Sequence, residues 1–231
     1  MSDTGRFSGD IAEAAALVAG GTGGLGAPIA AELAARGATV ITVSRSSAAV
    51  GLVPTHHISA DLRSADEAIR VVNEVVGTHG RLDIVVNAVG VVAFGDVVST
   101  SVDTVEELFL TNVFAHVFLC TAALPRMSQG GVIAAISGVV AEQNLPGLVV
   151  YGASKAAVRS FDEGFAREAR RAGVRVIDAR PPHTETGLAS RPIAGAAPRF
   201  PPGLAPASVA RRIVEAIADG TTDLPSSAFS A

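Results

Sequence analysis

The stretch Ala15-Ala-Leu-Val-Ala-Gly20-Gly-Thr-Gly-Gly24-Leu-Gly26 decides the fold. An apolar run passes through a glycine-rich turn into an amphipathic segment. Glycine permits a tight turn and a close approach of the backbone to a phosphate, and the first turn of a helix offers free N–H groups to an anion. Between a first strand and a first helix, this pattern predicts a dinucleotide-binding loop. Its expected cofactor contacts are Gly20, Thr22, Gly23, Gly24, Leu25 and Gly26.

The rest of the chain continues this alternation of short apolar runs and longer amphipathic segments. Runs rich in Val and Ile, typical of strands buried on both faces of a parallel sheet, lie at 15–19, 39–43, 84–87, 132–136 and 174–179, with a weaker one at 55–58. Helices are expected at 25–36, 65–76, 102–124, 152–172 and 206–218. The alternation predicts one α/β domain over 1–231, a doubly wound parallel sheet of about six to seven strands with helices on both faces.

Composition argues against several classes of protein. The formal charge of −4 gives no basic footprint for nucleic acid. Cys120 is the only cysteine, which excludes an intrachain disulfide, and the histidine spacing indicates no metal site. No uninterrupted apolar run reaches the roughly 18 residues of a membrane span, and the first residues lack the order of a signal peptide. We therefore expect a cytoplasmic protein that binds no metal, nucleic acid or membrane.

The end of the second expected strand bears on the choice of cofactor. Dinucleotide-binding folds read the adenosine ribose at this position: an acidic residue takes the ribose hydroxyls, and an arginine accommodates a 2′-phosphate. Here the chain has Ser44 and Arg45 and no carboxylate. The sequence therefore predicts NADP(H) as the cofactor, with NAD(H) as the alternative.

The single tyrosine and the single lysine of the chain stand four residues apart, in Tyr151-Gly-Ala-Ser-Lys155. On a helix this spacing places both side chains on one face. An ammonium beside a phenol favours the phenolate, so we expect the pKa of Tyr151 to lie below its usual value of about 10. Such a group could donate or accept a proton near neutral pH.

A loop is expected at 187–206, where five prolines and three glycines interrupt any periodicity. It follows the sixth strand, at the carboxyl edge of the sheet where α/β proteins bind ligands. We interpret it as a substrate lid and call it the lid loop.

Taken in order, these motifs resemble the classical short-chain dehydrogenase/reductases over most of the chain. The glycine-rich loop resembles that family's phosphate loop, with Ala19 where threonine is usual. The resemblance implies a Rossmann-type fold, a small-molecule carbonyl or alcohol substrate, and a homotetramer or homodimer. It also implies further cofactor contacts, namely Asp61 and Leu62 at the adenine, the turn Asn87-Ala88-Val89, and Pro181, Thr184 and Thr186 after the sixth strand.

The catalytic residues implied by the resemblance are Tyr151, Lys155 and Asn112. In a reduction Tyr151 would donate a proton to the developing alkoxide. Lys155 would hold the nicotinamide ribose and lower the tyrosine pKa. Asn112 would anchor a water of a proton relay.

The family usually places a serine thirteen residues before the tyrosine, where this chain has Gly138. Three interpretations remain open. Ser137, next to it, could supply the missing hydrogen bond through an irregular strand end. His183 could supply it instead. Alternatively, carbonyl chemistry is weak or absent, and the protein binds a dinucleotide as a sensor or an interaction partner. A second departure is Pro182, where the family usually has glycine.

Overall fold

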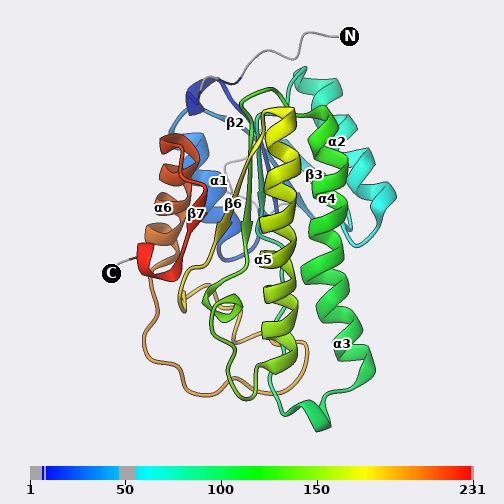
Figure 1. The fold of residues 1–231 in the computed structure, drawn as a ribbon, viewed down its shortest axis with the longest axis vertical. Helices are drawn as coiled ribbons and strands as arrows, with labels where there is room; N and C mark the ends of the chain where they lie inside the picture. Colours follow the sequence, from blue (N-terminus) through cyan, green and yellow to red (C-terminus); the bar gives the residue numbers. More distant parts are fainter. Residues whose placement is uncertain (1–6, 8, 47–55, 230–231) are drawn as a thin grey trace.

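The computed structural model describes residues 7, 9–46 and 56–229, and Figure 1 shows it as a sheet with helices on both sides. Seven parallel strands are ordered β3-β2-β1-β4-β5-β6-β7. Their bounds are β1 Ala15–Ala19, β2 Thr39–Ser44, β3 His56–Ser59, β4 Ile84–Asn87, β5 Val132–Ile136, β6 Arg175–Ala179 and β7 Asp223–Leu224. The predicted α/β class and parallel sheet are confirmed. The weak strand predicted at 55–58 corresponds to β3; residue 55 itself lies outside the described residues.

The six α-helices of the described residues form two layers. Their bounds are α1 Gly26–Ala35, α2 Ala65–His79, α3 Val102–Phe109, α4 Ala115–Ala123, α5 Val149–Ala169 and α6 Pro206–Asp219. Helices α1 and α6 pack on one face of the sheet around Ile29, Leu33 and Ile213. Helices α2, α4 and α5 cover the other face, around Leu119, Ile133 and Phe165. Both faces are buried, which explains why the strands are apolar with little alternation.

The helix expected at 102–124 is interrupted. Leu110–Phe114 forms a π-helical turn between α3 and α4, in which Ala115 N–H bonds to the carbonyl of Leu110. Such an insertion shifts the hydrogen-bond register by one residue and is frequent at functional sites. Asn112 stands in this turn. By length and hydropathy Val102–Arg126 is the one membrane-span candidate within the described residues, and half of its most apolar window is buried in the protein.

The topology brings the predicted motifs to one edge of the sheet. The strand order reverses between β1 and β4, and the loops that follow these two strands meet there. A Cβ on Gly20 would lie 2.8 Å from the carbonyl carbon of Ala88. This crevice at the carboxyl ends of the strands is where ligands bind in open α/β sheets.

Candidate active site

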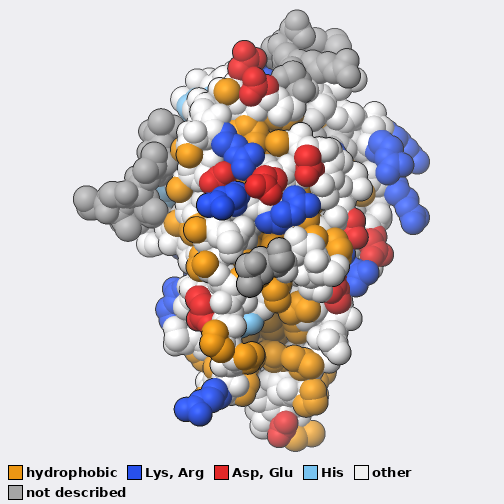
Figure 2. Space-filling view, turned by 90° about the vertical axis from the view of Figure 1, so that its left-hand side faces the viewer, with side chains coloured by type: hydrophobic (Ala, Val, Ile, Leu, Met, Phe, Trp, Pro, Cys, Tyr) orange, Lys and Arg blue, Asp and Glu red, His pale blue; other side chains and the backbone are white. Residues whose placement is uncertain are grey.

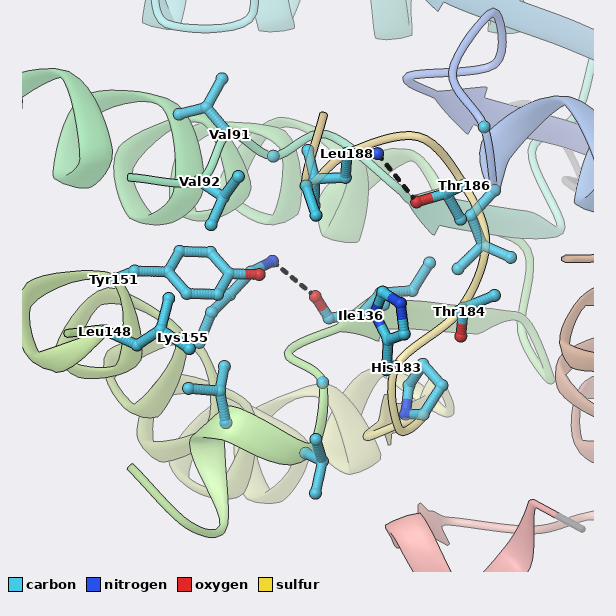
Figure 3. A pocket seen from close by; sticks show the side chains of 18 of the residues that line it. Val91, Val92, Ile136, Leu148, Tyr151, Lys155, His183, Thr184, Thr186 and Leu188 are labelled. Carbon is cyan, nitrogen blue, oxygen red and sulfur yellow. Dashed lines mark hydrogen bonds between the residues drawn. The ribbon is translucent and has the colours of Figure 1, made fainter. Parts of the chain in front are cut away.

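One large cavity, of about 640 Å³, opens at the carboxyl edge of the sheet. Its walls include Gly23 and Gly24 at one end and Tyr151 and Lys155 towards the other. Figure 3 shows Tyr151 and Lys155 projecting into it from α5, opposite the segment that carries His183 and Thr184. The predicted dinucleotide loop and the predicted proton-transfer pair therefore share one chamber, although 128 residues separate Gly23 from Tyr151 in the chain.

The glycine-rich loop has the geometry that a pyrophosphate requires. Gly20 has φ +75°, a conformation that other residues rarely adopt. A Cβ on Gly26 would lie 2.1 Å from the carbonyl oxygen of Gly20, and one on Gly24 would lie 2.1 Å from that of Thr186. Helix α1 begins with neither a side-chain cap nor an acidic residue in its first turn. An anion can therefore approach its N–H groups without competition.

Arg45 extends the cofactor end of the cavity beyond the end of β2. Its side chain is exposed and lines the cavity, and its charge helps to lower the pKa of Asp61. Hydrogen bonds from Arg63 are the larger cause of that lowered pKa. Asp61 is held at 2.6 Å by Arg63, which also binds Glu107 at 2.9 Å. Cationic and anionic groups thus lie at this end of the cavity, and the residues present fit a dinucleotide.

Not every predicted site residue reaches the cavity wall. The wall includes Gly23, Gly24, Leu25, Arg45, Ala88, Val89, Ser137, Tyr151, Lys155, Pro181, Thr184 and Thr186. The other predicted residues, Gly20, Thr22, Gly26, Ser44, Asp61, Leu62, Asn87 and Asn112, are not among its lining residues. Several of these support the wall from behind: Gly20 and Gly26 let backbones pack closely, and Leu62 is buried in the core with α2.

Lys155 is fixed by the end of β5. Only 7% of it is exposed, and its ammonium donates a hydrogen bond of 2.8 Å to the carbonyl of Ile136. Burial lowers the pKa of Lys155 to about 8, and the nearby Asp178 carboxylate opposes this effect. At pH 7 the side chain is therefore mainly cationic, but its charge is lost about two pH units earlier than that of an exposed lysine.

The expectation of a lowered tyrosine pKa is wrong for this state of the protein. Burial raises the pKa of Tyr151 to about 12. The physical reason is that the surrounding residues exclude water, which would otherwise stabilise the phenolate. Tyr151 accordingly holds its proton at neutral pH and is suited to donate it.

Asn112 is held in place rather than free. Its Oδ1 accepts the N–H of Val91 at 2.8 Å, and its Nδ2 donates to the carbonyl of Val91 and to the hydroxyl of Ser154. The Ser154 hydroxyl in turn donates to the carbonyl of Tyr151 at 2.7 Å. Asn112 thus joins the π-helical turn, the loop after β4 and the first turn of α5. It fixes the element that carries the tyrosine.

The hydroxyl of Ser137 points to a neighbouring strand. It donates to Oδ1 of Asp178 on β6 at 2.5 Å, and the residue is fully buried. Asp178 is also paired at 2.7 Å with Arg180, whose guanidinium binds Glu142 and Asp223 as well. This arrangement does not favour the interpretation in which Ser137 replaces the missing serine.

Gly138 has φ +80° and ψ 164°, a region that is almost restricted to glycine. Its N–H and that of Ser137 both bond to the carbonyl of Ala179. A Cβ built there would meet nothing nearer than the Pro181 carbonyl at 3.9 Å, so space is available. Backbone conformation, rather than crowding, therefore accounts for the glycine.

His183 lies on the cavity wall beyond Pro181 and Pro182. Its ring stacks on Phe200 of the lid loop with centroids 4.8 Å apart, and its Nε2 lies 3.5 Å from a carboxylate oxygen of Glu185. The stacking fixes the ring plane at the boundary of the chamber. Ser137 also lines the cavity, but its hydroxyl is bound to Asp178; of the two side chains that sequence reasoning offered in place of the missing serine, His183 is therefore the better candidate.

The lid loop is bound to the loop after β4 near its middle, and it leads directly into α6. Ile193 N–H bonds to the carbonyl of Val92, and Phe94 N–H bonds to that of Ala194. Helix α6 begins at its last residue, Pro206. Beneath the lid loop a small apolar cluster gathers, formed by Val92, Phe94 and Leu148 with Leu188, Ala189, Ala197, Phe200 and the ring of Tyr151.

Sequence reasoning missed this apolar wall. Val92, Phe94 and Leu148 come from segments without periodicity, and nothing local distinguishes a loop residue that lines a cavity from one that faces solvent. Figure 2 shows hydrophobic side chains gathered in the lower part of one face, around a hollow, whereas charged groups gather above. The catalytic end of the site is thus an apolar chamber with few polar side chains.

A parallel sheet with a dinucleotide loop at its switch point and a tyrosine–lysine pair in the same cavity defines a nucleotide-dependent oxidoreductase of the Rossmann type. Residues 14–194 match the family model described as short chain dehydrogenase. The chain belongs to the short-chain dehydrogenase/reductase family, as its motifs predicted.

Individual relatives agree with this assignment. The chain is 33% identical over 217 residues to a hydroxynaphthalene reductase of Aspergillus fumigatus, covering 89% of this chain and 78% of that protein. It is 33% identical to the short chain dehydrogenase/reductase AacuN of Aspergillus aculeatus, where the match covers 66% of this chain and 62% of the relative. A short chain dehydrogenase of Burkholderia cenocepacia, solved in complex with NADP, is similar with a TM-score of 0.80 and 26% identity, covering 98% of this chain and 100% of that one.

Proposed function

We propose that the protein is an NADP(H)-dependent oxidoreductase that interconverts a carbonyl group and a secondary alcohol on a mainly apolar small molecule. The observation that carries the proposal is the single cavity in which the glycine-rich loop, Arg45, Tyr151 and Lys155 meet. The apolar wall around Val92, Phe94 and Leu148 supports an apolar substrate. The similarity to a hydroxynaphthalene reductase supports a ring-bearing one.

When bound, the nicotinamide supplies the hydride chemistry, and the protein manages position and proton. Tyr151, which burial keeps protonated at neutral pH by raising its pKa to about 12, donates its proton to the substrate oxygen. Lys155, held by the carbonyl of Ile136, would keep a positive charge beside the developing alkoxide and would bind the ribose. Asn112 fixes the first turn of α5 through Ser154. His183 is our candidate for the donor that replaces the missing serine.

The direct test combines binding with turnover. NADPH and NADH are titrated against the protein by nicotinamide fluorescence, and apolar ring ketones are then screened for loss of nicotinamide absorbance. Binding of NADPH with turnover of at least one ketone supports the proposal. Binding without turnover on any of them favours the second candidate, a dinucleotide-binding sensor or interaction partner. The hydrogen bond from the Ser137 hydroxyl to Asp178 supports this second candidate, because it keeps that hydroxyl away from a substrate. No binding would exclude both.

The cofactor preference should depend on Arg45. Replacing Arg45→Glu removes a charge-assisted contact to a 2′-phosphate, worth about 1.5–3 kcal/mol, and adds repulsion. We expect the affinity ratio of NADPH to NADH to fall by about 10- to 100-fold. Arg211→Glu, an equal change of charge at an exposed residue of α6 that does not line the cavity, is the control and should leave the ratio unchanged. An unaltered ratio in Arg45→Glu would contradict a 2′-phosphate site.

The pH dependence should follow Lys155. Its pKa of about 8 means that the ammonium is present below pH 8 and is lost above it. Since kcat/KM reports ionisations of the free enzyme, kcat/KM for NADPH should be level from pH 6 to about pH 7.5. Above about pH 8 it should fall, approaching tenfold per pH unit. In Lys155→Met it should be lower throughout and lack this inflection; an inflection that survives would show that another group titrates.

The assembly and location remain part of the proposal. We propose a cytoplasmic homodimer or homotetramer, as members of the family commonly form. Phe114 on the outer side of the π-helical turn, 48% exposed and 6.1 Å from the ring of Phe118, gives that region an apolar surface. Light scattering after gel filtration would give the mass of the assembly, and a monomer at micromolar concentration would refute this part.

A further inference from the structure

A buried polar chain lies behind the cofactor side of the cavity. Nδ2 of Asn87, at the end of β4, lies 3.0 Å from Nδ1 of His116 on α4, and Nε2 of His116 lies 2.7 Å from Oδ1 of Asp162 on α5. His116 is fully buried and Asp162 is 2% exposed. Their neighbours are mostly apolar, with the Phe161 ring edge-on to His116 at 5.5 Å and Cys120 within 3.7 Å. Nothing in the mechanism proposed above uses these groups.

The hydrogen bonds determine the direction of the chain. Oδ1 of Asn87 accepts the N–H of Val89 at 3.0 Å, so its Nδ2 is the atom that faces His116. An amide nitrogen only donates, and Nδ1 of His116 must therefore accept. The imidazole proton is then on Nε2, which donates to Asp162. Burial opposes a charge on His116, but Cys120 and Asp162 raise its pKa well above the usual value. A second proton on Nδ1 would, however, face the amide hydrogens of Asn87, so the hydrogen bonds favour the neutral ring with its proton on Nε2.

This chain ends on the turn that the cofactor contacts. Val89, whose N–H is bound by Asn87, lines the cavity together with Ala88 and Gly90. Ala88 lies against Gly20 so closely that a Cβ on that glycine would be 2.8 Å away. If the amide of Asn87 turned over, its Nδ2 would face the N–H of Val89, and two donors would oppose each other. The rotamer and orientation of Asn87 therefore set the shape of this turn.

The other end of the chain is on the helix that carries the proton donor. Asp162 and Tyr151 both belong to α5, eleven residues or about three turns apart. The second oxygen of Asp162, Oδ2, is buried without a hydrogen-bond partner among the described residues. A buried carboxylate with an unpartnered oxygen is costly and calls for an explanation. If Asp162 served only to fill space, an apolar side chain of similar size would be more stable at this position.

We propose that His116 and Asp162 are positioning residues for the cofactor: they orient the amide of Asn87, so that the turn 87–90 is held at a fixed place relative to α5 and Tyr151. This inference rests on the proposed use of NADP(H) and adds two residues that touch neither cofactor nor substrate. The proposal requires that His116 and Asp162 affect NADPH binding only through the orientation of Asn87.

The test is a double-mutant cycle read by NADPH binding, measured by fluorescence titration. His116→Leu should weaken NADPH binding by about three- to tenfold, the loss expected for one displaced hydrogen bond. Asn87→Ala should weaken it at least as much. In the double variant the loss should equal that of Asn87→Ala alone, because His116 acts only through that amide. Additive losses would overturn the proposal.

Asp162 provides the conservative comparison. Asp162→Asn keeps an oxygen that can accept the Nε2 proton and should retain NADPH affinity within about twofold, whereas Asp162→Leu should lose it as His116→Leu does. Leu119→Val, a buried change on α4 that involves no hydrogen bond, is the control for general destabilisation. It should lower the melting temperature without changing affinity. If affinity follows melting temperature across all variants, the role is merely structural and the proposal is wrong.

A second readout is independent of cofactor. In the free protein, ¹⁵N spectra of the histidines should contain one imidazole with a protonated Nε2 and an unprotonated Nδ1, and its signal should vanish in His116→Leu. A protonated Nδ1 would overturn the proposal. If the wild-type protein shows this tautomer but does not bind NADPH, the proposed function has failed rather than the assignment of the network.

Discussion

Replacing Tyr151→Phe should reduce kcat for carbonyl reduction by about 10²- to 10⁴-fold, the range for removal of a general acid. Phenylalanine retains the ring, which packs with Val92, Phe94 and Leu148. The change therefore deletes the proton and little else. Because the aromatic ring stays and at most one hydrogen bond is lost, the affinity for NADPH should stay within about threefold of wild type. Stopped-flow measurement of NADPH oxidation gives kcat, and fluorescence titration gives the affinity for NADPH.

The outcome also separates the two candidate functions. An enzyme whose tyrosine is the acid loses turnover and keeps binding. If a measurable wild-type rate were unchanged by the substitution, the proton would come from elsewhere, and His183 would be the first group to examine. Ser154→Ala, which removes the hydrogen bond to the carbonyl of Tyr151, is a useful companion. It should lower kcat less than Tyr151→Phe, since the phenol remains present but is less firmly placed.

Gly138→Ser should destabilise the protein without raising kcat. The backbone at this residue, φ +80° and ψ 164°, is nearly restricted to glycine. A side chain forced into such a region costs about 1–3 kcal/mol. For a chain of this size this loss corresponds to a melting temperature lower by roughly 2–12 °C. Calorimetry or thermal denaturation followed by circular dichroism measures the change.

Gly138→Ala is the matched variant, because it carries the same backbone strain and no hydroxyl. With this backbone conformation, both variants should lose similar stability, and their kcat values should agree within about twofold. A serine variant with a rate at least tenfold above the alanine variant would mean that the backbone can turn and present the hydroxyl to substrate. In that case the missing serine limits catalysis, and the present orientation of Ser137 towards Asp178 is not needed for it.

The contrast between these two experiments reflects how the site is built. The proposed proton donor Tyr151 is present and half-buried, whereas the position at which the family usually has serine is a glycine with φ +80°. The neighbouring Ser137 is bound to Asp178, which forms an ion pair with Arg180, and Glu142 and Asp223 complete the charge balance. Removing one member would leave a buried charge unpaired, which is strongly destabilising.

Much of the architecture was predictable because it depends on local patterns. Apolar runs of four to six residues predicted all seven strands except β7, which has two residues. The glycine-rich loop needed no partner to be recognised, since a turn from strand to helix is a property of adjacent residues. The Tyr151–Lys155 spacing likewise follows from helical geometry alone. In each case the informative residues are neighbours in sequence as well as in space.

The π-helical turn was not predictable in the same way. Residues 110–114 have ordinary helical composition, and the insertion becomes visible only when Asn112 is seen bonded to Val91 and Ser154, residues 21 and 42 positions away. The apolar wall of the chamber and the anchoring of the lid loop through Ala194 also depend on pairs of segments that are distant in the chain.

The sequence by itself determined the fold class, the family and the residues that can move a proton, because periodicity, glycine and side-chain chemistry act over a few residues. Only the tertiary structure decided the pKa of Tyr151, the direction of the Ser137 hydroxyl and the conformation of Gly138. The first depends on how much water the surrounding elements exclude, and the second on a carboxylate 41 residues away. The third depends on a backbone path held by hydrogen bonds to β6. Solvation and long-range contacts exist only after the chain has folded.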